Sequence, residues 1–410
     1  MKKLINKKIY RIFLLVVLVV ILVGTIWYIK NEEDFSNLVS RPQGVKMWQA
    51  DPRPLQSEKA VIKQTNKLNL KNKGQDVSLK SMELVVIPGL RGAWSINPKT
   101  KKAAFGDDWI PQGVTQSDDN YYISVYDGDY HLDSLIFQID KKTKKYVKTI
   151  ILNSKAHVGG IVYDEKYKQL IYSNDTSKSA GFGYLSKTDM DAYHAEKVKA
   201  PIHSKEIKWP IGSRTSAITL YNNQLLVAKY GSNKNDRSIV AVPLDSKGFV
   251  PVPSNEELTK LDSEMTQESS KTKDSDTIMK KYVQILVQMK LLNSWAPAWD
   301  RLQGIAVSKI GVTLLTQSNG QAPGKLWVQL PKKGTDSSRL DYIPPTTGVR
   351  EISIPASVEG ISLDSSENQI ALVFESGAKK YRKNNSLFFH SNYMDRLMIL
   401  PISISGNKNN

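Results

Sequence analysis

The stretch AHVGGIVYDEKYKQLIYSND, from Ala156 to Asp175, has the form of one unit of a repeat. It begins with the small residues Gly159 and Gly160, continues through an apolar run and a polar turn, and ends in a second alternating run. Alternation with period two between turn residues predicts two antiparallel strands joined by a tight turn. If the pattern recurs along the chain, it decides the fold.

The same pattern occurs four more times. Each copy has a small or polar start, an apolar residue, a polar turn, a strand and a polar end. The copies are WIPQGVTQSDDNYYISVYDGD (Trp109–Asp129), SRTSAITLYNNQLLVAKYGSN (Ser213–Asn233), DRLQGIAVSKIGVTLLTQSNG (Asp300–Gly320) and SVEGISLDSSENQIALVFESG (Ser357–Gly377). The five starts are Gln112, Gly159, Ser216, Gln303 and Glu359.

Further strand-like runs follow most copies, such as SLIFQID (Ser134–Asp140) and GKLWVQLP (Gly324–Pro331). Units of about 40–55 residues with four strands are typical of β-propeller blades, which bury both faces by stacking around an axis. The segment Val85–Phe105 resembles strands of one more blade. We therefore expect an all-β propeller of six blades, or of five if that segment is not a blade, closed by strands from both ends of the chain. Two stacked β-sandwich domains are the alternative.

The N-terminal region predicts a membrane segment. Ile12–Ile29 is 18 residues without a charge, about 27 Å long as a helix, and Trp27 and Tyr28 lie at its end, where an interfacial aromatic belt would be. Basic residues between Lys2 and Arg11 precede it, which favours a cytoplasmic N-terminus and an extracellular remainder. No A-x-A-like cleavage site follows, so we favour a signal anchor; a cleaved signal peptide is the alternative.

These patterns give a domain plan. Residues 1–30 form the cytoplasmic tip and transmembrane anchor, residues 31–74 an extracellular stalk, 75–404 the propeller, and 405–410 a flexible tail. A helical insertion is expected at about 254–294, with a polar, acidic and mobile first half and an amphipathic second half packed on the propeller. Lys187–Ala200 is a second helical candidate.

Composition narrows the classes of function. The 410-residue chain has no cysteine, which removes disulfides, thiolate nucleophiles and cysteine–zinc sites, and an exported protein without disulfides is compatible with a Gram-positive bacterium. The net charge is +17, of which the first 30 residues supply six. This sign favours an anionic partner such as a cell-wall polymer, or a surface protein, whereas the scattered basic residues indicate no nucleic-acid interface. The sequence contains no G-x-S-x-G motif of a serine nucleophile, no H-E-x-x-H motif of a zinc-binding helix and no G-x-x-x-x-G-K-[ST] motif of a phosphate-binding loop.

The repeat itself yields a candidate site. In a propeller the start of the innermost strand and the end of the next strand lie on one face, so polar residues at these positions should meet at one channel mouth. The candidate ligand-binding residues are Gln112, Arg214, Arg301, Gln303 and Glu359, and the candidate catalytic residue is His157. At the second-strand ends lie Asp127, Asp129, Asn174, Asp175, Asn319 and Glu375.

Each candidate has a second interpretation. His157 is either a general base or a residue that braces the channel. Asp127, Asn174, Asp175 and Glu359 are either calcium ligands or ordinary turn and channel residues. Arg214 and Arg301 either clamp a carboxylate or phosphate, or neutralise Glu359.

The QGV, GGI, SAI, QGI and EGI starts and the four-strand units resemble six-bladed propellers of the gluconolactonase, strictosidine-synthase, YncE and NHL types, over roughly Val85–Ile404. The resemblance implies a divalent metal held in the channel by Glu, Asn and Asp, for which Glu359, Asn174 and Asp127 are the nearest residue types. Two functions follow as hypotheses. The first is an extracellular, membrane-anchored propeller that binds a ligand or protein at its channel mouth; the second is a calcium-dependent lactonase or esterase with His157 as base.

Overall fold

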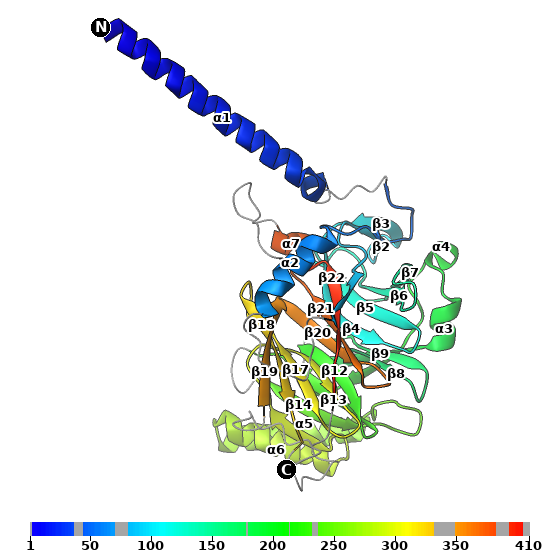
Figure 1. Ribbon diagram of the computed structural model, residues 1–410. Coiled ribbons are helices and arrows are strands. Elements are labelled where there is room, and N and C mark those ends of the chain that lie inside the picture. Colours follow the sequence, from blue (N-terminus) through cyan, green and yellow to red (C-terminus); the bar gives the residue numbers. More distant parts are fainter. Residues whose placement is uncertain are drawn as a thin grey trace.

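The computed structural model describes residues 2–36, 44–69, 81–177, 179–212, 214–231, 237–331, 349–382 and 393–404. Within them the chain folds into five four-stranded antiparallel sheets arranged as the blades of a propeller (Figure 1). The blades, from the innermost strand outward, are β4–β7 (Trp109–Gln116, Asn120–Asp127, Leu135–Asp140, Tyr146–Ile151), β8–β11 (Ile161–Asp164, Gln169–Ser173, Ala180–Ser186, Lys205–Trp209), β12–β15 (Thr215–Tyr221, Gln224–Lys229, Ser238–Pro243, Ser294–Pro297), β16–β19 (Leu302–Val307, Thr313–Gln317, Pro323–Gln329, Val349–Ala356) and β20–β22 with β1 (Val358–Leu363, Gln369–Phe374, Arg396–Pro401, Glu83–Val86). The all-β propeller prediction is confirmed.

The five innermost strands form a closed ring. Each contacts the innermost strand of the next blade, and β20 of the fifth blade contacts β4 of the first. Four of these strands contain one of the five predicted repeat starts, and β8 begins two residues after the fifth, Gly159. The sequence repeat therefore marks the strands that surround the axis.

The expectation of six blades is wrong, and the alternative of five is correct. Strand β1 is the outermost strand of the fifth blade, paired with β22 in the register Glu83↔Ile399. Strands β2 (Ala93–Asn97) and β3 (Lys102–Gly106) form a separate two-stranded sheet. A hairpin has the same alternation as two blade strands, which is why the pattern suggested a sixth blade. Closure of the ring by both ends of the chain is confirmed.

Small residues allow the innermost strands to approach one another. A Cβ at Gly113 would lie 2.7 Å from the Gly159 carbonyl oxygen, and one at Gly360 would lie 3.1 Å from the Val114 nitrogen of the first blade. A Cβ at Gly304 would lie 2.9 Å from the Ile361 nitrogen. The glycine in the QGV, QGI and EGI starts is thus required by backbone of the neighbouring blade.

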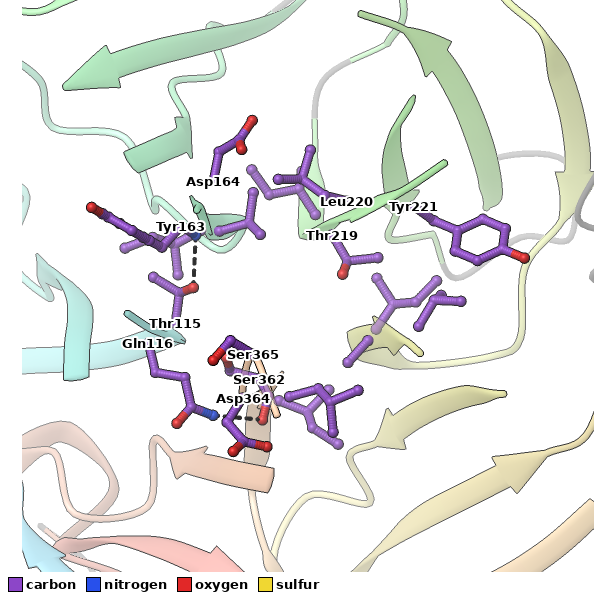
Figure 2. A pocket seen from close by; sticks show the side chains of 18 of the residues that line it. Thr115, Gln116, Tyr163, Asp164, Thr219, Leu220, Tyr221, Ser362, Asp364 and Ser365 are labelled. Atoms are coloured by element: carbon purple, nitrogen blue, oxygen red, sulfur yellow. Dashed lines mark hydrogen bonds between the residues drawn. The ribbon is translucent and has the colours of Figure 1, made fainter. Parts of the chain in front are cut away.

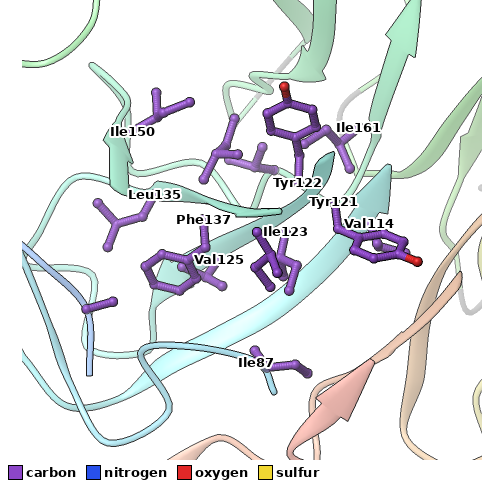
Figure 3. Packing of buried hydrophobic residues seen from close by; sticks show 14 of the residues in the cluster. Ile87, Val114, Tyr121, Tyr122, Ile123, Val125, Leu135, Phe137, Ile150 and Ile161 are labelled. Atoms are coloured by element: carbon purple, nitrogen blue, oxygen red, sulfur yellow. The ribbon is translucent and has the colours of Figure 1, made fainter. Parts of the chain in front are cut away.

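Apolar side chains between the sheets hold the blades together. Figure 3 shows the packing around the first blade, where Val125, Leu135 and Phe137 are completely buried and Ile87, in the loop after β1, packs with them. Deleting one such side chain costs about 2–5 kcal/mol. Packing of this kind runs from the first blade to the fifth.

Two insertions are helical. Lys187–Ala200 contains α3 (Lys187–Ala192) and α4 (Ala195–Val198). The longer insertion forms α5 (Asn255–Lys271) and α6 (Ser275–Gln288), and α6 buries Ile285 and Leu286 in the core of the second and third blades. Its predicted packing on the propeller is confirmed. The first half, expected to be mobile, is the helix α5, because Ser254 and Glu257 form a capping box that satisfies its first N–H groups.

The N-terminal helix α1 (Lys2–Ser36) contains an apolar span, Lys7–Trp27, long enough to cross a membrane, and the rest of the chain buries none of it. By length and composition it is compatible with a single-pass anchor or a signal peptide. Part of the expected stalk is ordered: α2 (Glu58–Asn69) packs against β19. The predicted tail, 405–410, lies outside the described residues.

We expect Gly113→Ala to lower the free energy of unfolding by about 1–3 kcal/mol, because the added methyl group meets backbone that cannot rotate away. Gly212→Ala is the matched control, since a Cβ there has no neighbour within 4 Å. Thermal or denaturant unfolding of the two variants in detergent measures the difference. Equal stability of both variants would contradict the role given to the ring of small residues.

Candidate functional site

A cavity of about 730 Å³ opens at the mouth where the innermost strands begin. All five blades contribute to its wall. The lining side chains are Gln112, Tyr126 and Tyr130 from the first blade, His157 and Asp175 from the second, Arg214, Thr215 and Tyr230 from the third, Gln303 from the fourth, and Glu359, Glu375 and Tyr381 from the fifth. The structure thus brings together Gln112, His157, Asp175, Arg214, Gln303 and Glu359.

Two carboxyl groups, one buried and one half-buried, lie at the fifth blade. Glu359 is the second residue of β20 and is 4% exposed, and Glu375 directly follows β21. The two side chains hydrogen-bond each other, and Gln303 Nε2 donates to Glu359 Oε1 at 3.2 Å. Burial raises the pKa of Glu359 well above its usual range, and the neighbouring Glu375 carboxylate raises it further.

Burial also raises the pKa of Glu375, although the hydrogen bonds from Tyr381 and Glu359 and the charge of Lys380 oppose this shift. Two carboxylates in contact cannot both ionise readily in a site of low dielectric constant. Sharing one proton between Glu359 and Glu375 is therefore favoured over ionisation of both groups.

An aromatic cluster forms the wall next to this pair. Tyr126, at the end of β5, packs with Tyr381 of the short helix α7 (Lys379–Arg382). The ring of His157 stacks on Tyr126 with centroids 4.1 Å apart, and Tyr130 Oη lies 2.5 Å from His157 Nε2. Tyr126 hydrogen-bonds Tyr130 in turn.

The neutral form of His157 is favoured in this setting. Burial lowers its pKa, Lys380 lowers it further, and Asp175 opposes the shift. The imidazole therefore serves as an uncharged wall of the cavity and as a hydrogen-bond partner of Tyr130.

Asp175 braces the second blade against the third. Its Oδ2 accepts a hydrogen bond from the Thr215 N–H at 2.7 Å and lies 3.8 Å from Lys229 Nζ. Lys229 also donates to Thr215 Oγ1 at 2.9 Å. Burial lowers the pKa of Lys229 to about 8. This ion pair is shared between two blades at the cavity wall.

Three predicted site residues do not line the cavity. Asp127 Oδ2 accepts backbone N–H bonds from His131 and Leu132, both at 2.9 Å, so it stabilises a turn. Asn174 Oδ1 lies 2.5 Å from Ser154 Oγ. The Arg301 side chain bonds Asp300 at 3.0 Å and Asn319 at 2.8 Å at the surface.

The four predicted calcium ligands are consequently not gathered at one point. Asp127, Asn174 and Asp175 use their side-chain oxygens within the protein, and only Asp175 and Glu359 line the cavity. Among the described residues, no group of three or more His, Asp or Glu side chains is arranged to hold a metal ion. The donor set of this region does not fit the calcium centre that the resemblance implied.

Sequence reasoning missed Tyr126, Tyr130, Tyr381 and Lys229. Lys229 carried a usable signal, because it is a lone charge at the end of the second strand of its copy, in register with Thr215. Tyr381 follows a strand in a segment without a repeat, so no periodicity pointed to it.

A second cavity, of about 400 Å³, lies where the innermost strands end, and no residue lines both cavities. The apolar residue of each repeat start lines it: Val114, Ile161, Ile218, Ile305 and Ile361. Figure 2 shows two hydrogen bonds at this cavity, with Gln116 Nε2 donating to the Ser362 carbonyl and the Tyr163 N–H donating to Thr115 Oγ1. The buried acidic pair makes the first cavity the stronger candidate site.

The raised pKa values predict a pH-dependent stability. An acid whose pKa is higher in the folded protein stabilises it at low pH, and this contribution is lost as the pH rises through the folded-state pKa. We expect the contribution of the pair to the free energy of unfolding to fall as the pH rises above about 4.3, the usual pKa of a glutamic acid, by about 1.4 kcal/mol for each unit by which folding raises the pKa. Glu359→Gln should reduce this fall, because it removes one titrating carboxyl group and leaves Glu375 without an anionic neighbour.

Denaturant unfolding of the full chain in detergent at several pH values measures this dependence. Glu206→Gln, at an exposed strand position, is the control and should follow the unmodified protein. An identical pH profile for Glu359→Gln and the unmodified chain would refute the shared proton.

Comparison with known proteins shows distant likeness only. No protein-family model and no curated protein matches the chain. Among solved structures it is similar to a PQQ-bound aldose sugar dehydrogenase from Streptomyces coelicolor (10% identity, TM-score 0.41, covering 79% of this chain and 99% of that one). It is also similar to a gluconolactonase from Xanthomonas campestris (8%, 0.34, 80% and 98%) and to a protein from Lactobacillus plantarum (10%, 0.34, 69% and 84%). The assignment as a five-bladed propeller therefore rests on the sheet topology of this chain.

Proposed function

We propose that this chain is a membrane-tethered, extracellular propeller that binds a small polar ligand in the cavity at its channel mouth. The observation that supports this most is the cavity itself, about 730 Å³ in volume and lined from all five blades. A pocket of this size with aromatic walls and a few convergent polar groups is the usual form of a small-molecule site. The groups that define it are the Glu359–Glu375 pair, the tyrosines, Gln112, Gln303 and Arg214.

The tether part of the proposal rests on the apolar span Lys7–Trp27 and on the basic residues that precede and begin it. Positive charge on the N-terminal side favours retention of that end in the cytoplasm. The propeller then lies outside the cell, and its net positive charge is suited to an anionic cell surface.

A hydrolase is the second candidate, favoured by the carboxyl pair, since one protonated and one ionised group can act as acid and base. Turnover of chromogenic esters and lactones, measured with calcium and with chelator, separates it from simple binding. Hydrolysis that disappears in Glu359→Gln would support the enzyme over the binding protein.

Ligand binding is tested by a thermal-shift screen of sugars, amino acids, amines and soluble wall polymers against the full chain in detergent, because a ligand of the folded state raises the melting temperature. We expect compounds that bind to lose affinity about tenfold or more in Arg214→Ala, a cavity residue. Arg301→Ala is a matched control, because both arginines have a left-handed backbone but Arg301 lies outside the cavity. Equal losses in the two variants would remove the cavity from the proposal.

Membrane topology is tested with single cysteines, since the chain has none of its own. We expect a membrane-impermeant maleimide to label Lys197→Cys, exposed in α4, on intact cells. Lys3→Cys should be labelled only after permeabilisation, on a band of full length. A shortened band that lacks the Lys3→Cys label would instead indicate a cleaved signal peptide.

A further inference from the structure

The inner end of the cavity contains two acidic groups that form no ion pair within the described residues. Glu359 is 4% exposed and lines the cavity together with Glu375. Lys380 of α7 acts on Glu375 through its charge without forming an ion pair with it, and Lys229, in the third blade, is paired with Asp175. Buried negative charge is normally matched by a cation. Here the cavity is the side from which such a cation can arrive.

The neighbouring side chains suit a cation as well. Tyr126 and Tyr381 place aromatic rings beside the carboxyl pair, and tyrosine faces attract ammonium groups. Gln112 and Gln303 each donate a side-chain N–H within the protein, to the Pro111 carbonyl at 3.1 Å and to Glu359. Their amide oxygens can accept hydrogen bonds from a ligand.

The rim of the cavity has the opposite charge. Arg214 is exposed at the start of β12, and Lys155 donates to the Tyr130 carbonyl from the surface at 3.2 Å. A ligand that spans the cavity therefore meets an acidic inner end and a basic entrance. An ammonium group at one end and an anionic group at the other match this layout.

We propose that the cavity binds a zwitterionic primary amine of the amino-acid type, with its ammonium group between Glu359, Glu375 and the rings of Tyr126 and Tyr381, and its anionic group at Arg214. This inference rests on the proposed binding function and specifies its ligand class. A primary ammonium has three N–H donors, which two carboxylates and one glutamine oxygen can accept.

Binding then displaces a proton. In this proposal the empty pair holds one proton, and the bound ammonium group stabilises both carboxylates in their ionised form. The singly protonated pair therefore binds R–NH₃⁺ and releases one H⁺ to solvent, which leaves both carboxylates ionised around the ligand. The groups facing the pair are Gln303 from β16, Tyr126 from β5, and Lys380 and Tyr381 from α7; His157 lies one ring further away. Affinity should therefore increase as the pH rises towards the pKa of the ligand amine.

Titration calorimetry with 6-aminohexanoate as the probe tests this inference. In phosphate and in HEPES at pH 7, two buffers without a primary amine, the difference in observed heat gives the number of protons released, which we expect to approach one per ligand. Glu359→Gln and Glu375→Gln should each weaken binding about tenfold or more and abolish the proton release. Arg214→Ala should weaken binding of 6-aminohexanoate but leave that of hexylamine unchanged, and Arg301→Ala should alter neither.

The control probes separate the two proposals. Hexanoate lacks the amine and should bind at least tenfold more weakly than 6-aminohexanoate. If hexanoate binds equally well, in an Arg214-dependent manner and without proton release, the cavity is a binding site but the ammonium site is wrong. Absence of binding by both 6-aminohexanoate and hexylamine at millimolar concentration also overturns the ammonium site, while the proposed function is then judged by the sugars and polymers of the broader screen.

Discussion

The contact between innermost strands at the axis is the constraint on which the rest of this structure depends. Five blades enclose a narrow ring, so the backbone of one innermost strand lies against the next, as the neighbours of Gly113, Gly304 and Gly360 demonstrate. Only a hydrogen or a small side chain fits at these places. The residue before each of these glycines, Gln112, Gln303 and Glu359, is then directed to the cavity by the alternation of the strand. The close approach that builds the ring thus also sets the polar lining of the site.

A buried acidic pair reduces stability unless its surroundings are held firmly. The fifth blade, which carries the pair, is fixed by the segment that precedes α2. Asp395 is fully buried, pairs with Arg396 at 2.5 Å, and accepts the Leu55 N–H at 2.6 Å. Arg396 donates in turn to the Gln56 carbonyl at 3.0 Å. The blade that closes the ring is therefore also cross-linked to the N-terminal segment, which gives the acidic pair a rigid support.

Much of the fold followed from the sequence, because each innermost strand carries both strand alternation and a small residue imposed by its neighbour. The number of blades did not follow from the sequence, since β2 and β3 have the same alternation as blade strands but pair only with each other.

At the site, the positions of Gln112, His157, Gln303 and Glu359 followed from their place in the repeat alone. Tyr381 did not, because α7 lies in a connection between β21 and β22 that has no counterpart in the repeat. Asp127 and Asn174 occupy the predicted strand ends, but the Asp127 carboxylate accepts hydrogen bonds in its own turn and Asn174 Oδ1 accepts one from Ser154.

Net charge and local charge act over different distances in this protein. The excess of lysine and arginine gives a positive field that attracts anions, but salt screens exposed charges beyond about 8–10 Å. Glu359 is buried and Glu375 is half-buried at the cavity wall, so the pair acts mainly on a group that has entered the cavity. A purely anionic ligand would be drawn to the rim and repelled at the inner end, and a purely cationic one would be repelled on approach. A ligand that carries both charges satisfies the two regions in the order in which it meets them, which is the physical reason for preferring a zwitterion.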